Sequence, residues 1–255
     1  MRNVWIIFRK ELHSYFVSPV AYILVAMFAI IFGFFFWNGL GSFVYYAIQS
    51  QMSGRAIPMN VNEELIRPLL SNFNVVMLFF IPMITMRLFA EEKRTGTFEL
   101  LATSPIRDLE VISGKWLAAL VIYLGMLLVT ALDFVFVFKY GHPDWKPVAV
   151  AYLGMLLQAG GMLAIGMFIS SLTKNQIIAG AVTFGACLVL WVLGWTSGYE
   201  TATWAQVLSY MSITTHMEPF SKGVLDTKDT IYYLTLIFLG FFLTARSLES
   251  LRWRA

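Results

Sequence analysis

Long apolar runs separated by short polar stretches dominate the chain. A helix needs about 20 mainly apolar residues to cross a bilayer core of about 30 Å, because lipid cannot satisfy exposed backbone groups. The runs that meet this requirement lie at residues 20–37, 73–89, 116–138, 148–169, 177–195 and 231–245. The pattern therefore predicts an all-α membrane protein with six transmembrane helices in a single transmembrane domain, residues 1–255. Pro82 is expected to kink the second span.

Residues 1–19, ahead of the first run, have a different pattern. Lys10 and His13 lie away from the face of a helical wheel on which the large apolar side chains recur, which carries Trp5, Phe8, Leu12, Tyr15 and Phe16. This spacing predicts an amphipathic helix in the lipid headgroup layer, with Ile6 and Ile7 as exceptions to the pattern. The alternative is a longer first span, which Pro19 disfavours.

Composition and charge support a membrane protein and indicate its orientation. Hydrophobic residues make up 58% of the chain and charged residues 13%, well below the roughly 25% of soluble domains. If both termini are cytoplasmic, twelve Lys and Arg flank the spans on that side and six lie opposite, whereas acidic residues outside the spans divide evenly. This is the bias of the positive-inside rule, and it gives the net charge of +3 a topological meaning. No nucleic-acid partner is expected.

The predicted cytoplasmic loop at residues 90–115 contains the densest charge cluster of the chain. Phe98, Leu100 and Leu101 place apolar surface among these charges, and Ser104 followed by Pro105 is typical of a helix N-cap and first helical position. We therefore expect two short helices that meet at a turn and dock into a groove on a soluble partner. A solvated loop whose cations only enforce topology is the alternative, and composition leaves both open.

Two segments carry a resemblance to a known family. The stretch EEKRTGTFELL at residues 91–101, followed by Pro105 and Lys115, resembles the signature of ABC-2 type transporter permeases. Near the end of the chain, THMEPFSKGVLD at residues 215–226, with Asp229 and the pair Tyr232 and Tyr233, is similar to the branch that holds gliding-motility and copper-enzyme-maturation permeases. The resemblance extends over essentially the whole chain in order.

The resemblance implies a fold, partners and a site. It implies an ABC-2 or type V exporter-like transmembrane subunit in the bacterial inner membrane, paired with a second permease chain as a homodimer or heterodimer. Two ATPase subunits would bind ATP and Mg, membrane lipid would surround the spans, and an auxiliary extracytoplasmic protein is a further partner. A coupling helix would lie at about residues 95–102. The implied ATPase-coupling residues are Glu91, Glu92, Arg94, Gly96, Thr97, Phe98, Glu99 and Leu100, with Lys174 in a second, weaker contact.

The chain shows no motif for catalysis of its own. It contains no Gly-x-x-x-x-Gly-Lys-Ser/Thr loop to hold phosphates, so ATP hydrolysis is expected in a partner chain and no cofactor in this one. The three histidines are far apart and lack metal-ligand spacing, so no metal site is expected. His216 beside Met217 offers a copper site as an alternative, but a histidine in a surface loop is the expectation.

Asp133 is the one ionisable residue well inside a predicted span, which makes it a candidate intramembrane polar site. A proton-coupled secondary transporter that uses Asp133 is therefore an alternative function, and a membrane scaffold of a larger machine is another. An interhelical hydrogen bond or a polar span end is the simpler interpretation. Lys139 could pair with Asp133 only if the helix frays there.

The predicted outer loop at residues 196–230 contains a further amphipathic pattern. Trp204, Val207, Leu208 and Met211 recur at helical spacing, which predicts a short outer helix before the sixth span. The family resemblance implies that such a helix lies near the exit of the pathway, and an aromatic interface anchor is the alternative that requires no transport.

Overall fold

The structure is a computed structural model of the chain, and it describes residues 2–52, 60–98, 105–195 and 203–252. All secondary structure in these ranges is helical, as the sequence predicts. Six helices are long and apolar enough to cross a membrane, which agrees with the six predicted spans. They are α2 (Val20–Met52), α3 (Arg67–Thr85) with its flanking helices, α6 (Asp108–Gly141), α7 (Trp145–Leu172), α8 (Gln176–Val192) and α11 (Thr227–Arg252).

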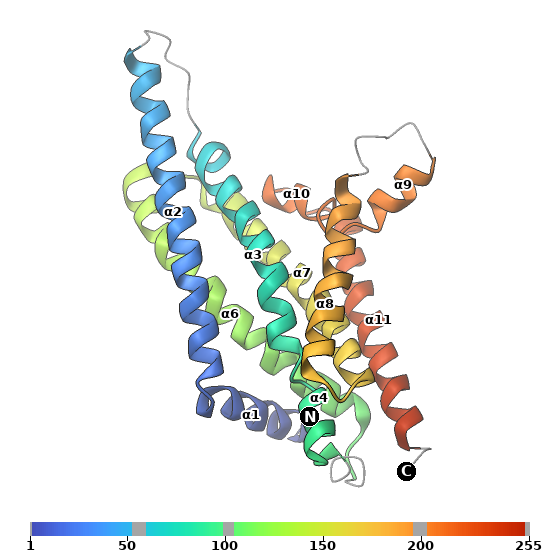
Figure 1. Ribbon diagram of the computed structural model, residues 1–255. Helices are drawn as coiled ribbons and strands as arrows, with labels where there is room; N and C mark the ends of the chain where they lie inside the picture. The colour runs from blue at the N-terminus through green and yellow to red at the C-terminus, as the bar shows by residue number, and fades with distance from the viewer. Residues whose placement is uncertain (1, 53–59, 99–104, 196–202, 253–255) are drawn as a thin grey trace.

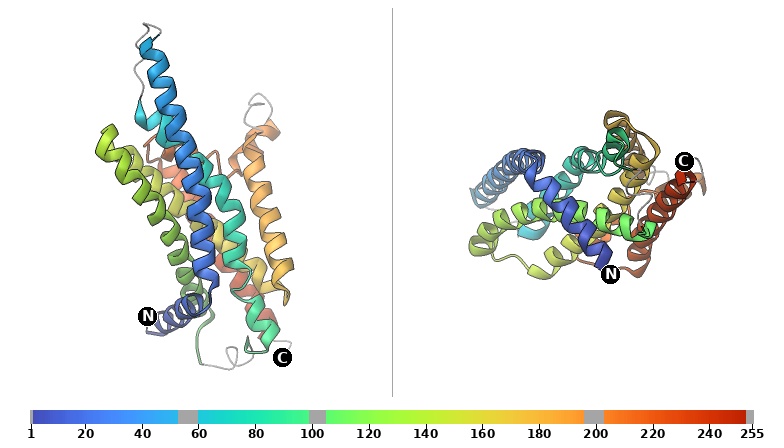
Figure 2. Two further views of the ribbon diagram at one scale, coloured as in Figure 1. Left: turned by 60° about the vertical axis from the view of Figure 1, so that its left-hand side comes forward. Right: turned by 90° about the horizontal axis from the view of Figure 1, so that it is seen from below.

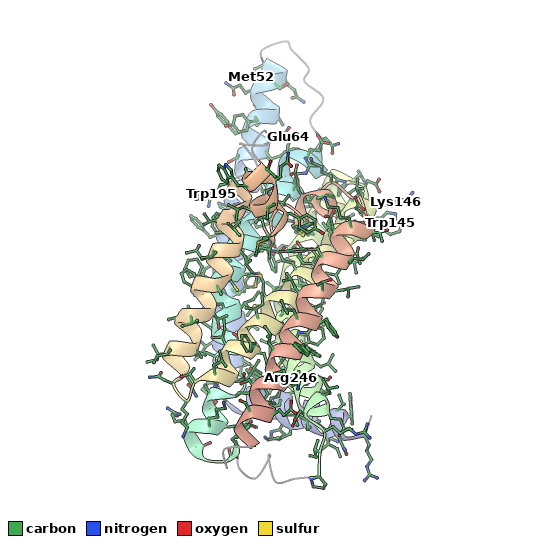
Figure 3. The ribbon with its side chains drawn as sticks, turned by 90° about the vertical axis from the view of Figure 1, so that its right-hand side faces the viewer. Met52, Glu64, Trp145, Lys146, Trp195 and Arg246 are labelled. Atoms are coloured by element: carbon green, nitrogen blue, oxygen red, sulfur yellow. The ribbon has the colours of Figure 1, made fainter. Side chains whose placement is uncertain are left out.

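Four helices, α2, α6, α7 and α11, run past the apolar segments that predict them. At a rise of 1.5 Å per residue, the 33 residues of α2 extend for about 50 Å, whereas a bilayer core is about 30 Å thick. Backbone hydrogen bonds continue a helix through polar residues, so the length of an apolar run underestimates the length of its helix. Figure 3 shows the consequence, because Met52 lies beyond the level of Trp145 and Trp195.

Both ends of the described chain lie at one end of the bundle, as Figure 1 shows. We call this the basal end; it contains α1 (Arg2–Val17), α4 (Ala90–Thr95) and the last turns of α11. The opposite, distal end contains the π-helical turn η1 (Asn62–Ile66), α9 (Thr203–Tyr210) and α10 (Met217–Ser221). An even number of spans returns the chain to the end where it began.

Helix α7 lies at the centre and contacts α3, α6, α8, α10 and α11. Small residues allow this close packing: a side chain at Gly166 would overlap Thr85 of α3, and one at Gly240 of α11 would overlap Ala164. By contrast, α2 and α8 bury few of their side chains against the rest of the bundle. These outer helices supply the surface that a bilayer or another membrane chain must cover.

Helix α1 lies across the base beneath α6, as the view from below in Figure 2 shows. The prediction of a helix before the first span is confirmed. Trp5 and Phe16 of its predicted apolar face are exposed, so lipid can cover them, whereas Tyr15 of the same face is buried against the bundle together with Ile7.

The distal segment before α11 forms two short helices, and α9 corresponds to the predicted outer helix. The apolar residues that predicted this helix face outward. Trp204 and Val207 of α9 and Met211 directly after it are exposed, and Ala205 is the buried residue of α9. Trp145 and Trp195 lie on opposite sides of this end in Figure 3. Exposed tryptophans at one level are typical of a membrane–water interface.

Candidate functional site: the basal charge cluster and the α4 turn

The second span is interrupted just before the predicted coupling region. Pro82 lies inside α3, the helix ends one turn later at Thr85, and α4 begins at Ala90. Proline has no backbone N–H, so it weakens the helical ladder at this point. The four residues between the helices redirect the chain, and α4 then packs against α7 and α8.

Ser170 of α7 stabilises this interruption. Its hydroxyl oxygen accepts hydrogen bonds from the backbone N–H groups of Phe89 and Ala90, each at 3.1 Å, and its O–H donates to the carbonyl of Met86 at 3.2 Å. Ser170 is fully buried, and a helix break without such a partner would leave backbone polar groups unpaired. One side chain on the central helix therefore holds α3 and α4 in fixed relation.

The exposed tip of this region follows α4. Gly96 has φ +74°, a left-handed conformation that ends the helix and that glycine adopts at no steric cost. Arg94, Thr95, Gly96 and Thr97 are all exposed. We call these four residues the α4 tip. They form a short polar turn that projects from the base.

A group of four charged side chains lies behind this tip, and we call it the basal charge cluster. The Lys115 ammonium on α6 lies 2.9 Å from Glu11 Oε1 of α1 and 2.9 Å from Glu92 Oε1 of α4. The Lys10 ammonium lies 3.1 Å from the same Glu92 oxygen and 3.4 Å from Glu11. Two cations therefore face two carboxylates where three helices meet.

The members of the basal charge cluster differ in exposure. The Lys115 side chain is 1% exposed, those of Glu11 and Glu92 are 12% and 13% exposed, and that of Lys10 is 60% exposed. Burial lowers the pKa of Lys10, but the two carboxylates beside it have the larger combined effect and raise its pKa above the usual value. The cluster thus has a buried cation at its centre and a hydrated one at its edge.

Other contacts anchor α1 and α4 around this cluster. The Asn3 amide donates to Glu110 of α6 at 3.0 Å, and the Tyr15 hydroxyl donates to the carbonyl of Ile84 on α3 at 2.9 Å. Burial raises the pKa of Tyr15. The Lys115 ammonium also lies 5.2 Å from the centre of the Phe89 ring. Helices α1, α3, α4 and α6 are therefore tied together through polar groups.

The structure divides the predicted coupling residues into groups. Arg94, Gly96 and Thr97 belong to the exposed α4 tip, whereas Glu92 belongs to the basal charge cluster. Glu91 accepts a hydrogen bond from Arg87 at 2.7 Å. Phe98 is half-buried beneath the Lys93 ammonium. Lys174 is exposed in the α7–α8 turn beside α4. Glu99 and Leu100 lie outside the described residues.

The helix start predicted at Pro105 is wrong. Helix α6 begins at Asp108, and its N-cap is Arg107. The Arg107 backbone N–H donates to Glu110 at 3.2 Å, so an acidic residue in the first turn satisfies this end of the helix. Ser104 lies outside the described residues.

Asp133 is half-buried on α6, far from the basal charge cluster along that helix. Within the described part of the chain, it forms no hydrogen bond or ion pair. The suggested partner Lys139 instead lies over the Tyr140 ring, 5.5 Å from its centre. Nearby, Tyr152 shares a hydrogen bond of 2.7 Å with Thr130. Among the residues that the structure describes, no hydrogen bond links Asp133 to this pair, and its role as an intramembrane polar site stays a prediction.

The expectation that His216 lies in a surface loop is wrong. Its side chain is 2% exposed, and Nδ1 lies 2.6 Å from Asp229 Oδ1 of α11. Nε2 lies 2.8 Å from the Tyr210 carbonyl, so Nε2 must carry a proton because a carbonyl only accepts. The Tyr232 ring stacks on the imidazole at 3.8 Å. We call these four residues the distal latch, since they tie the α9–α10 segment to α11.

Sequence reasoning did not name Glu11 as a member of the site, and it gave Lys115 only as part of the resemblance to the permease signature. A further signal for Lys115 is a cation at the start of an apolar run, and for Glu11 an acid within an otherwise amphipathic helix. Neither signal states which residue the side chain meets. Among the described residues there is no group of three or more His, Cys, Asp or Glu side chains that could hold a metal ion.

Comparison with known proteins agrees with this architecture. The family model described as ABC-2 family transporter protein matches residues 5–245. The chain belongs to this family. Two curated relatives, both named "Probable multidrug ABC transporter permease YbhR", come from Escherichia coli strain K12 and Escherichia coli O157:H7. Each is 25% identical to this chain over 138 residues, which is 53% of this chain and 37% of the relative.

These findings support a permease subunit of an ABC transporter. The match covers well under two thirds of the relatives' own length. In this ABC-2 permease the basal charge cluster and the α4 tip both lie within the matched residues. The gliding-motility or copper-enzyme branch stays a prediction.

Proposed function

We propose that this permease couples ATP hydrolysis by two separate ATPase subunits to export or mechanical work across the bacterial cytoplasmic membrane. The basal end faces the cytoplasm, and a second permease chain completes the complex. ATP and Mg²⁺ are bound by the ATPases, and an auxiliary extracytoplasmic protein is a further partner at the distal end. The observation that carries this proposal is the basal charge cluster behind an exposed turn.

The α4 tip supplies the docking contact in this proposal. Its residues are polar and exposed, and Lys174 of the neighbouring turn adds a second cationic contact. Gly96 lets the backbone approach a partner closely because it carries no side chain. A short projecting turn of this kind fits a groove on the ATPase.

The basal charge cluster supplies the transmission step. Glu92 is on the same short helix as the α4 tip, and its carboxylate reaches both α1 and α6 through Lys10 and Lys115. A displacement of α4 therefore moves charges that are bonded to two other helices. Ser170 links the start of α4 to α7 as well. Nucleotide-driven movement of the ATPase would pass along these contacts to the spans.

A crosslinking experiment tests the docking contact. A photo-crosslinker placed at Thr97 should capture the ATPase in native membranes, whereas the same group at Lys146 should not. Lys146 is an exposed residue at the distal end, as Figure 3 shows, so it controls for accessibility. Capture from Lys146 and not from Thr97 would reverse the orientation and overturn the proposal.

A second experiment separates docking from transmission. Glu92→Gln keeps a hydrogen-bonding side chain but removes the charge between Lys10 and Lys115. We expect stimulation of ATP hydrolysis by the permease to fall about tenfold, which corresponds to roughly 1.5 kcal/mol for a charged hydrogen bond, while crosslinking from Thr97 persists. Glu64→Gln, an exposed acid at the distal end, is the matched control. Unchanged stimulation in Glu92→Gln would exclude the cluster from coupling.

A further inference from the structure

The distal end contains a polar cleft of about 500 Å³. It is formed where the start of η1, the turn between α6 and α7 and the end of α10 meet, so three distant parts of the chain contribute to it. Its lining includes Asn62, Arg67, His142, Asp144 and Lys222. Such a lining offers hydrogen-bond donors and acceptors, the cations of Arg67 and Lys222, and the carboxylates of Glu63 and Asp144.

An amphipathic cleft of about 630 Å³ lies on the other side of α10, between α3 and α8. Leu70, Val75 and Met217 contribute apolar surface, and Trp191 and Trp195 form an edge-to-face pair with ring centres 5.3 Å apart. Trp195 is labelled in Figure 3, where it lies at the distal end of α8. Both clefts have volumes typical of ligand pockets.

The two clefts share a wall. Arg67 and Ser221 line both of them, so the guanidinium of Arg67 lies at the junction between polar and amphipathic surfaces. Glu218 also lines the amphipathic cleft, but its carboxylate is paired with Lys222 one turn later. The one acidic side chain of that cleft is therefore neutralised by a neighbour.

Two buried polar atoms at this junction lack a partner among the described residues. They are Arg67 Nε, a donor, and Asn62 Oδ1, an acceptor. The orientation of the Asn62 amide is fixed, because its nitrogen donates to the Asp144 carbonyl at 3.0 Å and a carbonyl only accepts. Buried polar atoms are nearly always satisfied, so an unpaired donor and an unpaired acceptor indicate a ligand with complementary groups.

We propose that the joined clefts bind an anionic phospholipid whose headgroup carries hydroxyl groups. A phosphate oxygen accepts from Arg67, and a headgroup hydroxyl donates to Asn62 Oδ1. The acyl chains lie along Val75 and the tryptophan pair. The free acceptor of Asn62, the cation of Arg67 and the apolar wall follow one another in the order of the headgroup hydroxyl, the phosphate and the acyl chains of a phosphoglycerol lipid. This site is a property of the permease alone and does not depend on coupling to an ATPase.

Tryptophan quenching tests the proposal on the full-length permease in phosphatidylcholine nanodiscs. The probe is phosphatidylglycerol with brominated acyl chains, compared with brominated phosphatidylcholine at equal content. Quenching that is lost in Trp195→Phe reports on the cleft, and Trp145→Phe, an exposed tryptophan at the same end, is the control. We expect the Trp195 component to be larger with the anionic lipid, and Arg67→Gln to reduce this preference about tenfold.

Further variants keep the test decisive. Arg67→Lys retains the charge and should keep most of the preference, whereas Lys146→Gln removes a cation outside both clefts and should change nothing. Free glycerol phosphate should not displace the lipid; displacement would show that the site takes soluble phosphates and would overturn the proposal. Equal quenching by both lipids would overturn the anionic headgroup. Absence of any Trp195 component, as expected if a second polypeptide covers the cleft, would overturn the lipid site.

Discussion

The basal charge cluster and the distal latch both bury an acid against a base, yet they are built differently. In the distal latch, His216 and Asp229 are 13 residues apart, and both ring nitrogens are bonded within a shell of tyrosines. In the basal cluster, Lys115 reaches a carboxylate 104 residues away on another helix, and it shares both carboxylates with the hydrated Lys10.

This difference indicates different roles. The distal latch joins neighbouring segments through fully satisfied contacts, which favours one rigid arrangement. The basal cluster joins three separate helices, and Glu92 Oε2 is buried without a hydrogen-bond partner in the described chain. Because two cations can exchange partners there, the helices can shift while the charges stay paired. We therefore expect the distal latch to hold one fixed arrangement and the basal cluster to allow its helices to shift.

The largest effect is expected from Lys115→Met. This change leaves Glu11 and Glu92 facing each other without their buried cation, and breaking a buried pair costs about 3–5 kcal/mol. The melting temperature in detergent should fall, and a double mutant with Glu92→Gln should lose less than the sum of the two changes. Lys139→Met, an exposed lysine on the same helix, should shift the stability by less than about 0.5 kcal/mol. Equal effects at the two lysines would remove the basis of the comparison.

A change in the distal latch should be somewhat smaller and local. His216→Leu leaves the Asp229 carboxylate buried without its partner, at a cost of about 3 kcal/mol. Hydrogen exchange should rise in α9 and α10, while stimulation of the ATPase stays near normal because coupling occurs at the other end. His13→Leu, an exposed histidine on α1, is the control. If His216→Leu lowered stimulation of the ATPase without faster hydrogen exchange in α9 and α10, the distal latch would take part in coupling and would not be a fixed structural contact.

Ser170→Ala tests the link between α4 and α7. Its removal leaves the backbone N–H groups of Phe89 and Ala90 unpaired in a buried site, which should cost about 2 kcal/mol. Ser209→Ala, where the hydroxyl bonds only within its own exposed helix, should have little effect. If Ser170→Ala keeps the wild-type melting temperature, another group must satisfy the break in the second span.

The smallest effect is expected at the α4 tip. Gly96→Ala places a side chain at φ +74° and should cost about 1 kcal/mol, enough to reduce affinity for the ATPase about fivefold. Gly41→Ala, within α2 and with open space around its Cβ position, should be neutral or slightly stabilising. Binding measured with purified complexes would distinguish the two. Tighter binding in Gly96→Ala would mean that the turn adopts another conformation in the complex.

The sequence by itself determined the architecture of this protein. Six apolar runs predicted six spans, and the resemblance implied a tight turn at Gly96, where α4 ends in a left-handed conformation. These features are local: a run of apolar residues is sufficient for a span whatever its neighbours, and glycine is suited to a left-handed turn wherever it occurs. The second half of the coupling helix expected at about residues 95–102 lies outside the described residues.

Only the tertiary structure decided which side chains meet. Tyr15 faces the bundle and not the lipid, His216 is buried, and Glu92 pairs with Lys115 in the basal cluster. Each outcome depends on how helices rotate about their axes and where they cross, and residues about 100 positions apart can meet only after those choices are made. A hydrophobic pattern fixes that a helix is buried in a membrane or against protein, but the pairing of its few polar groups is set by the helices that surround it.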